Sequence, residues 1–413
     1  MKSFHRITWV IIVVFGFAIS ISGCQKALPP IEPVTITFVH QTYEASYYEP
    51  LVEEFEEQHP EITVELSAAA GNNPENYTQA DVLGVDLFRY IQLRSEDAFL
   101  DLSPLIEQDN SFKFSDFYPG TVELFSENEK IWALPSGVDT FVLYYNKNLF
   151  DQNGFGYPTN DWTWDDLLAV ASGIRKEPDT YGYGVPDPYL ELYAMILIHQ
   201  HGGQLFDDMD NPSGITYNQP LNVEAMQWLQ DLYYLYDVAP TPEQASSSFG
   251  YGNQAIFRGV LQGDIGIWPG NFSDRGGVTW PVPWDNLLWG MVALPGDVSS
   301  ATSGLATGYA ISARSQNPEA AWLWITFLTE QIPQALIPAR RAIAESDEFR
   351  DQIGAEAADA AAKSIQNVTL ISPDLFQFGN SLEYFSEAIN DILDGTASAQ
   401  EALDWAQDQV ENP

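Results

Sequence analysis

The stretch that decides the fold runs from residue 34 to residue 66 and reads VTITFVHQTYEASYYEPLVEEFEEQHPEITVEL. Its first six residues alternate apolar side chains with threonine and are rich in β-branched types, which predicts a strand. In residues 51–57 (LVEEFEE) the apolar side chains fall on one helical face and the glutamates on the other. This pattern predicts an amphipathic helix whose acidic face is solvated, rather than a metal site.

The end of the same stretch completes a structural unit. His59-Pro60 is expected to end the helix, and the alternation of Ile62, Val64 and Leu66 predicts a second strand. A strand, a helix and a strand within about 35 residues form a βαβ unit, which predicts a parallel sheet covered by helices.

The rest of the chain continues this alternation, so we predict an α/β fold. Residues 80–87 (ADVLGVDL) predict a third, buried strand. Three later helices carry start signals: Thr163 with Asp166 and Ser398 with Glu401 as capping boxes, and Asn317-Pro318 as N-cap and first residue.

The composition excludes several functions. The 413 residues include 58 acidic and 17 basic side chains, a formal net charge of −41, and 45% are hydrophobic. This is globular material for two or three domains. A surface this negative repels phosphate backbones and anionic lipid headgroups, so we expect neither nucleic-acid binding nor electrostatic docking on membranes. The single cysteine, Cys24, excludes an internal disulfide.

The N-terminus predicts export. Lys2 and Arg6 precede an apolar run over 7–19 that is short for a membrane span, and ISGC at 21–24 resembles a bacterial lipobox. We therefore predict a signal peptide over 1–23, a lipid on Cys24, a tether over 24–33, and a protein anchored by lipid alone to the outer face of the bacterial membrane. The alternative is a plain secretory signal with an incidental cysteine.

Several further segments, in order along the chain, resemble a known family. They are LVEEFEEQHPEITVEL (51–66), ALPSGVDTFVLYYNKNLF (133–150), YPTNDWTWDDLL (157–168), GDIGI (263–267), NPEAAW (317–322) and PAR (338–340). Together they resemble the bacterial extracellular solute-binding proteins of ABC importers, in particular the sugar-binding group that includes maltose-binding protein.

The resemblance implies two α/β lobes joined by chain crossovers, with a ligand cleft between them. Lobe I would comprise residues 31–138 and 297–338, and lobe II residues 139–296 and 339–413. The implied function is capture of a mono- or oligosaccharide by a monomer, which delivers it to the permease subunits of an ABC transporter without catalysis or a cofactor.

Two alternatives stay open. The acidic surface would attract a cationic ligand, such as a polyamine or a peptide, in the same role. A surface hydrolase acting on glycans would share the signal, the aromatic residues and the acids, because 58 carboxylates produce chance pairs.

Ligands of open α/β sheets bind at the carboxyl ends of strands, and sugars need flat aromatic surfaces together with a few polar groups. The aromatic candidates could instead pack in the core, and Arg340 could pair with surface acids. The candidate ligand-binding residues lie beside predicted strands, at the predicted crossover or in the Pro-Ala-Arg motif: His40, Gln41, Tyr43, Asp86, Arg89, Asp139, Tyr144, Trp268, Asn271, Phe272, Trp284, Gly308, Tyr309 and Arg340.

No motif for a catalytic nucleophile, a nucleotide phosphate or a zinc protease is present. His199 and His201 form a His-x-His pair without a third clear ligand, for which we predict a structural role. The acids of residues 207–211 lack the spacing of a calcium loop and predict a turn. We therefore expect no metal.

Overall fold

The structure, a computed structural model, describes residues 33–41, 44–69, 77, 79–207 and 212–412. The predicted signal peptide, Cys24, all of the tether except Pro33, and Tyr43 lie outside the described residues. Within the described ranges, no helix combines the length and apolar character needed to cross a membrane.

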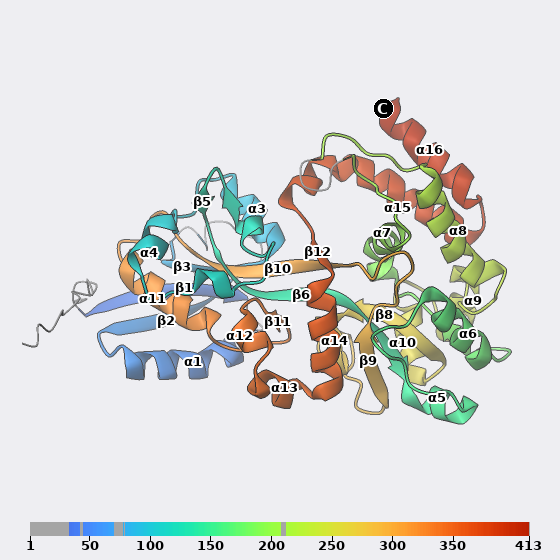
Figure 1. Cartoon of the computed structure of the whole chain (residues 1–413), viewed down its shortest axis with the longest axis horizontal. Coiled ribbons are helices and arrows are strands. Elements are labelled where there is room, and N and C mark those ends of the chain that lie inside the picture. Colours follow the sequence, from blue (N-terminus) through green and yellow to red (C-terminus); the bar gives the residue numbers. More distant parts are fainter. Residues whose placement is uncertain (1–32, 42–43, 70–76, 78, 208–211, 413) are drawn as a thin grey trace, which may run out of the picture.

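One sheet runs through both lobes of the molecule (Figure 1), with its main path in the order β2-β1-β3-β10-β6-β8-β7. Strands β9 and β11 pair with β6, and β12 pairs with β10. The strands are β1 Val34–Gln41, β2 Ile62–Ala69, β3 Val82–Val85, β6 Leu134–Asn146, β7 Tyr181–Tyr183, β8 Ile265–Asn271, β9 Trp289–Ala293, β10 Thr302–Ile311, β11 Ile337–Pro338 and β12 Val368–Leu370, with a separate hairpin of β4 Ser126–Glu127 and β5 Lys130–Ile131.

Strand β6 connects the two lobes. Its first half, Leu134 to Thr140, pairs antiparallel with β10, and its second half, Phe141 to Asn146, pairs with β8 and β9. Strand β10 spans the same junction, because its start pairs with β12 and its end with β3. Both strands are therefore continuous through the junction and connect the two lobes.

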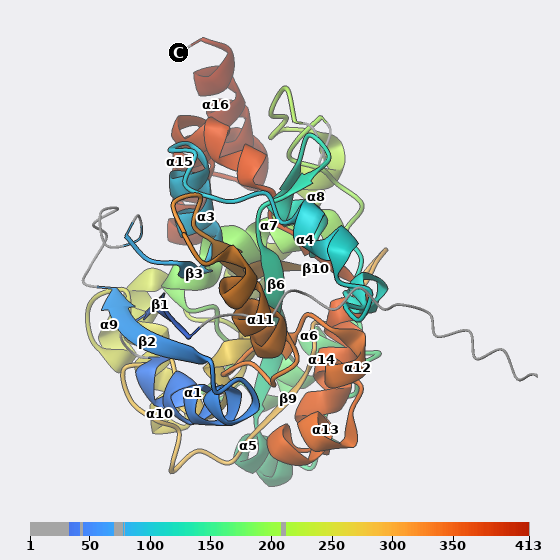
Figure 2. The same ribbon diagram turned by 90° about the vertical axis from the view of Figure 1, so that its left-hand side faces the viewer.

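In lobe I, helices α1 and α11 pack against the sheet and against each other, while α3 lies on the opposite face (Figure 1). Figure 2, in which this lobe faces the viewer, shows α11 in front of β6 and α1 beside β2. Trp322, Trp324 and Phe55 are buried between these layers. The helices are α1 Ala45–Gln58, α3 Leu87–Arg94, α4 Ser103–Gln108 and α11 Pro318–Thr329, with short 3-10 turns at η2 Phe114–Asp116 and η3 Glu123–Phe125.

In lobe II the helices surround the second half of β6 and its neighbours. Helix α14 packs against β9 and β6, α6 against β7, and α15 and α16 form a layer with α7 and α8. The helices are α5 Lys147–Asn153, α6 Trp164–Ile174, α7 Leu190–Gln200, α8 Pro220–Tyr234, α9 Pro242–Phe249, α10 Ala255–Gln262, α12 Arg341–Ala344, α13 Asp347–Ile353, α14 Ala355–Gln366, α15 Gly379–Asp394 and α16 Ala399–Glu411, with 3-10 turns at η4 Asp187–Tyr189, η5 Phe272–Gly277 and η6 Pro373–Phe378.

The predicted fold class is confirmed, and so is the βαβ unit, since β1 and β2 pair in parallel on either side of α1. The capping boxes at Thr163 and Ser398 are both formed. The predicted helix start is also confirmed: Asn317 is the N-cap and Pro318, whose fixed φ suits the first turn, is the first helical residue, although the Asn317 side chain makes no cap hydrogen bond. The exact lobe boundaries stay predictions.

Candidate ligand-binding site

A polar pocket lies where the strands of the lobe I sheet end towards lobe II. Strands β1 and β3 are parallel, so their carboxyl ends meet at one edge, and β10 runs antiparallel beside them. This is the edge at which open α/β sheets bind ligands. The pocket is lined by Gln41, Glu44, Tyr47, Tyr48, Gly84, Val85, Asp86, Ser136, Thr307, Gly308, Tyr309, Pro333, Gln334 and Leu336.

Gly308 shapes the floor of this pocket. The pairing of β10 with β6 shifts register between Thr307 and Gly308, and a Cβ at 308 would lie 2.8 Å from the Leu134 carbonyl oxygen. Only glycine permits this approach of the two backbones. At the same irregularity the hydroxyls of Thr307 and Ser136 lie 2.7 Å apart.

Two carboxyl groups lie on the pocket wall after β1 and β3. Glu44 Oε2 accepts the Gln41 backbone N–H at 2.9 Å, and burial raises the pKa of Glu44 to about 7. Asp86 caps α3 by accepting the Arg89 backbone N–H at 2.7 Å. The Arg89 guanidinium lies 4.2 Å from the centre of the Tyr77 ring and donates to Gln92. The predicted residues Gln41, Asp86 and Arg89 therefore lie close together.

A second polar cluster surrounds Asp139, at the middle of β6. The Asp139 carboxylate accepts two hydrogen bonds from Ser273, one from the backbone N–H at 2.9 Å and one from the hydroxyl at 2.6 Å. Burial raises the pKa of Asp139 to about 7. Arg275 Nη1 donates to the Ala335 carbonyl at 3.1 Å. Since Ala335 lies between two residues that line the lobe I pocket, the cluster adjoins that pocket.

Asp274 and Tyr189 extend the cluster into lobe II. Asp274 accepts the Tyr189 hydroxyl at 2.8 Å, the Asn271 backbone N–H at 2.8 Å and the Thr279 hydroxyl. Burial raises the pKa of Asp274 above its usual range and also that of Asp187, two residues before Tyr189. Carboxyl groups with raised pKa values gather at functional sites more often than elsewhere.

Sequence reasoning missed Asp187, Tyr189, Glu44 and Ser273. Asp187 and Tyr189 follow β7, which pairs in parallel with β8 and so ends at the same edge as Asn271. The rule that ligands bind at strand ends could have found them. However, β7 has only three residues, too few to show a strand pattern in the sequence.

Several predicted residues lie in the core beside the site. The Tyr144 hydroxyl donates to the Asn271 carbonyl at 2.7 Å, and its ring stacks on Trp268 with centroids 5.9 Å apart. Tyr144, Trp268, Phe272 and Trp284 are all at least 98% buried. The structure therefore places these four residues in the core, which is the alternative considered above for the aromatic candidates.

Two further predicted residues of lobe I, His40 and Tyr309, are buried. His40 is buried, and its Nδ1 lies 2.7 Å from the Gln41 carbonyl oxygen. Tyr309 is buried at the back of the pocket, where its hydroxyl lies 3.2 Å from that of Tyr48.

The structure places Arg340 away from the site. Its side chain is 4% exposed, lies 3.6 Å from the Asp116 carboxylate, and donates to the Thr329 hydroxyl at 3.1 Å. The rings of Phe112 and Phe117 enclose its guanidinium at 4.8 and 4.6 Å. These contacts engage Nε and Nη1, while Nη2 is buried without a hydrogen-bond partner among the described residues. Because Arg340 does not line the lobe I pocket, we do not carry it into the ligand site.

No group of three or more His, Cys, Asp or Glu residues in the described part of the chain is arranged to hold a metal ion. Of the two candidate histidines, His201 forms ion pairs instead: Nδ1 lies 2.5 Å from Asp297 and Nε2 lies 3.2 Å from Glu224. Burial lowers its pKa, but the hydrogen bonds to the two carboxylates outweigh this effect, so the pKa of His201 is raised.

We expect His201→Gln to lower the free energy of unfolding by about 1 kcal/mol at pH 6, with a difference that shrinks towards pH 9. When folding raises the pKa of a histidine, the histidine contributes its full stabilisation at pH values below its pKa in the unfolded chain. This stabilisation is lost as the pH rises through its pKa in the folded protein. Urea denaturation at both pH values measures the difference. The control is His199→Gln, since burial lowers the pKa of His199 and its pH trend has the opposite sign. A His201 difference that grows with pH would contradict the ion-pair argument.

Comparison with known proteins gives a consistent result. The family model described as bacterial extracellular solute-binding protein matches residues 40–335. An arabinooligosaccharide-binding protein of Bacillus subtilis is 25% identical over 62% of this chain and 60% of its own length, so the chain spans about three fifths of that relative. A second arabinooligosaccharide-binding protein, from Halalkalibacterium halodurans, is 23% identical over 71% of this chain and 68% of its own.

Solved structures share the fold over almost the whole chain. The ABC substrate-binding protein Lmo0181 of Listeria monocytogenes, in complex with cycloalternan, superposes with a TM-score of 0.71, at 23% identity over 91% of this chain and 98% of its own. The sugar-binding protein MalE of Xanthomonas citri superposes with a TM-score of 0.73, at 18% identity over 92% and 96%.

Proposed function

Because this chain belongs to the family of bacterial extracellular solute-binding proteins, we propose that it captures a carbohydrate between its lobes and delivers it to an ABC permease. The observation that carries the proposal is the meeting of the polar pocket of lobe I with the Asp139 cluster at the crossover strand β6. A ligand held by both lobes would stabilise the closed form, which the transporter would recognise.

The chemistry of the site favours neutral hydroxyl groups over cations. Burial raises the pKa of Glu44 and Asp139 to about 7 and that of Asp274 above its usual range. Partly protonated carboxyl groups attract cations poorly, but they can both donate and accept hydrogen bonds with sugar hydroxyls. The names of two relatives, which are arabinooligosaccharide-binding proteins, suggest pentose oligosaccharides as the first ligands to test.

A panel of ligands tests this function. Thermal unfolding would be followed with arabino-oligosaccharides, xylo-oligosaccharides, maltose and spermidine. A ligand at a hundred times its dissociation constant adds about 2.7 kcal/mol to the free energy of unfolding. Stabilisation by spermidine and by no carbohydrate would overturn the carbohydrate assignment. Release of shorter sugars from an oligosaccharide would instead support the alternative that the protein is a glycan hydrolase.

Affinity for the carbohydrate is expected to rise by up to about tenfold from pH 6 to pH 8. With pKa values of about 7, Glu44 and Asp139 become charged acceptors over this range, and charged acceptors hold hydroxyls more strongly than neutral ones. Isothermal titration at pH 6, 7 and 8 measures the change. An affinity independent of pH would mean that neither carboxylate contacts the ligand.

We further propose that the protein works as a monomer on the outer face of the membrane, held there through a lipid on Cys24. The support is the ISGC sequence at 21–24 behind an apolar run. When cells that express the full chain are grown with labelled palmitate, the protein should become labelled. The variant Cys24→Ser should not. Labelling that survives the substitution would contradict the anchor.

A further inference from the structure

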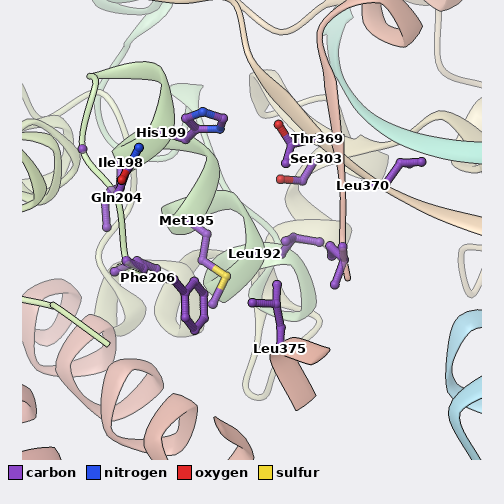
Figure 3. A pocket seen from close by; sticks show the side chains of 13 residues that line it. Leu192, Met195, Ile198, His199, Gln204, Phe206, Ser303, Thr369, Leu370 and Leu375 are labelled. Atoms are coloured by element: carbon purple, nitrogen blue, oxygen red, sulfur yellow. The ribbon is translucent and has the colours of Figure 1, made fainter. Parts of the chain in front are cut away.

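A second cavity lies beside the junction of the lobes, between α7 and the segment that begins at β12 (Figure 3). In Figure 3 the apolar side chains of Leu192, Met195, Phe206 and Leu375 gather in the lower part of the cavity. The polar side chains of His199, Ser303 and Thr369 lie above them, together with Ile198 and Leu370.

Helix α7 links this cavity to the candidate ligand site. Tyr189, whose hydroxyl bonds to Asp274, is the N-cap of α7, and Leu192, Met195 and His199 follow it at intervals of three, three and four residues. Residues at these intervals share one face of a helix. At 1.5 Å per residue, Leu192 lies about 4.5 Å and Met195 about 9 Å beyond Tyr189 along the axis. Leu192 and Met195, which line the cavity, therefore lie within about two helical turns of the residue that binds Asp274.

The size of the cavity limits what it can hold. Its free volume is about 50 Å³, and one water molecule needs about 10–15 Å³ on this scale. The space therefore holds a substituent of about three to five non-hydrogen atoms but not a sugar ring.

The polar side chains offer hydrogen-bond donors. Among the described residues, the hydroxyls of Ser303 and Thr369 donate to no protein acceptor. Burial lowers the pKa of His199, so its imidazole is neutral at pH 7 and carries one N–H. A carbonyl oxygen in the cavity would find these donors, and a methyl group would find the apolar wall.

We propose that this cavity is a subsite for the acetyl group of an acetylated carbohydrate whose sugar ring lies between the lobes. The acetyl group has three non-hydrogen atoms, a methyl for Met195 and Leu192, and a carbonyl oxygen for Ser303, Thr369 or His199. This inference rests on the proposed carbohydrate-binding function and narrows its substrate class. The acetyl group can belong to an O-acetylated sugar or to an N-acetylated amino sugar.

Isothermal titration of the full mature chain tests the subsite with two pairs of probes. One pair is O-acetylated xylotriose and the same sugar after alkaline deacetylation. The other is diacetylchitobiose and cellobiose, a neutral sugar with hydroxyls in place of the acetamido groups. One acetyl group in the cavity should strengthen binding about tenfold within the pair of the correct source. Equal affinity within both pairs would overturn the subsite and leave the carbohydrate function standing. Binding of no carbohydrate at all would overturn both.

Variants locate the effect. Met195→Phe should fill the cavity and remove the preference for the acetylated sugar, with unchanged affinity for the unacetylated one. Met195→Leu, which conserves size, is the matched control and should keep the preference. Ser303→Ala removes one donor from a partly exposed strand position and should reduce the preference without disturbing the fold. A preference that survives both Met195→Phe and Ser303→Ala would place the acetyl group elsewhere and overturn the proposal.

Discussion

The substitution Asp139→Asn is expected to raise the dissociation constant for the carbohydrate at least about 100-fold. Ser273 uses one lone pair on each Asp139 oxygen, so the carboxylate keeps acceptor positions for ligand hydroxyls. A hydrogen bond to a charged acceptor contributes about 1.5–3 kcal/mol, and loss of one or two such bonds gives the stated factor. Asparagine keeps the shape of the side chain but replaces one acceptor oxygen with a donor.

The same substitution should not destabilise the fold at pH 8. Because burial raises the pKa of Asp139 to about 7, the native state binds more protons than the unfolded state between about pH 4 and pH 7. Stability therefore falls as the pH rises through this window, and asparagine removes that loss. We expect Asp139→Asn to be about 1 kcal/mol more stable than the parent at pH 8, as measured by urea denaturation.

The control for this pair of measurements is Asp351→Asn, at an exposed position of α13. It should change neither the affinity nor the stability by a measurable amount. Parent-like titration of Asp139→Asn would remove this residue from the site. If Asp139→Asn clearly lowered the free energy of unfolding at pH 8, the charged, buried carboxylate of Asp139 would not be destabilising the parent protein.

A sequence pattern predicts a site residue only when that residue's position depends on its neighbours along the chain. The strand-end rule needs only local information, and it placed Gln41 and Asp86 at the edge where the structure has the pocket. The prediction of Asp139 rests on the crossover instead, and that of Gly308 on the segment before a predicted strand. The aromatic candidates needed the register between distant strands. Tyr144 on β6 is the direct cross-strand partner of Trp268 on β8, so the two rings fill the core together. Alternation within one strand does not say which face its partner covers.

Arg340 exposes a different limit. The Pro-Ala-Arg motif lies at the predicted boundary between the lobes, and β11 pairs with β6 just before Arg340. The direction of the side chain, however, depends on Lys113 and Asp116, which lie more than 220 residues earlier in the chain. No local pattern connects these segments. The burial of a guanidinium between two phenylalanine rings follows only from the tertiary structure.

Arg340→Ala is therefore expected to destabilise lobe I by about 3 kcal/mol and to leave the carbohydrate affinity of the folded protein within about threefold. Removal of a buried cation leaves its hydrogen-bond partners unsatisfied and its carboxylate partner, Asp116, uncompensated. The rings of Phe112 and Phe117 also lose the group that packs between them. Denaturation followed by tryptophan fluorescence would measure the stability, and titration of the folded variant would measure the affinity.

The neighbouring arginine provides the matched control. Arg341 also binds this segment, through Nη2 to the carbonyls of Ser115 and Phe117 at 3.3 and 3.2 Å, but its side chain is exposed. Water can replace those bonds, so Arg341→Ala should cost less than about 1 kcal/mol. If Arg340→Ala instead kept its stability and lost the ligand, Arg340 would belong to the binding site, as the sequence motif alone suggested. A large loss of stability with intact affinity would identify it as the residue that fastens the segment after β11 to the loop around Asp116.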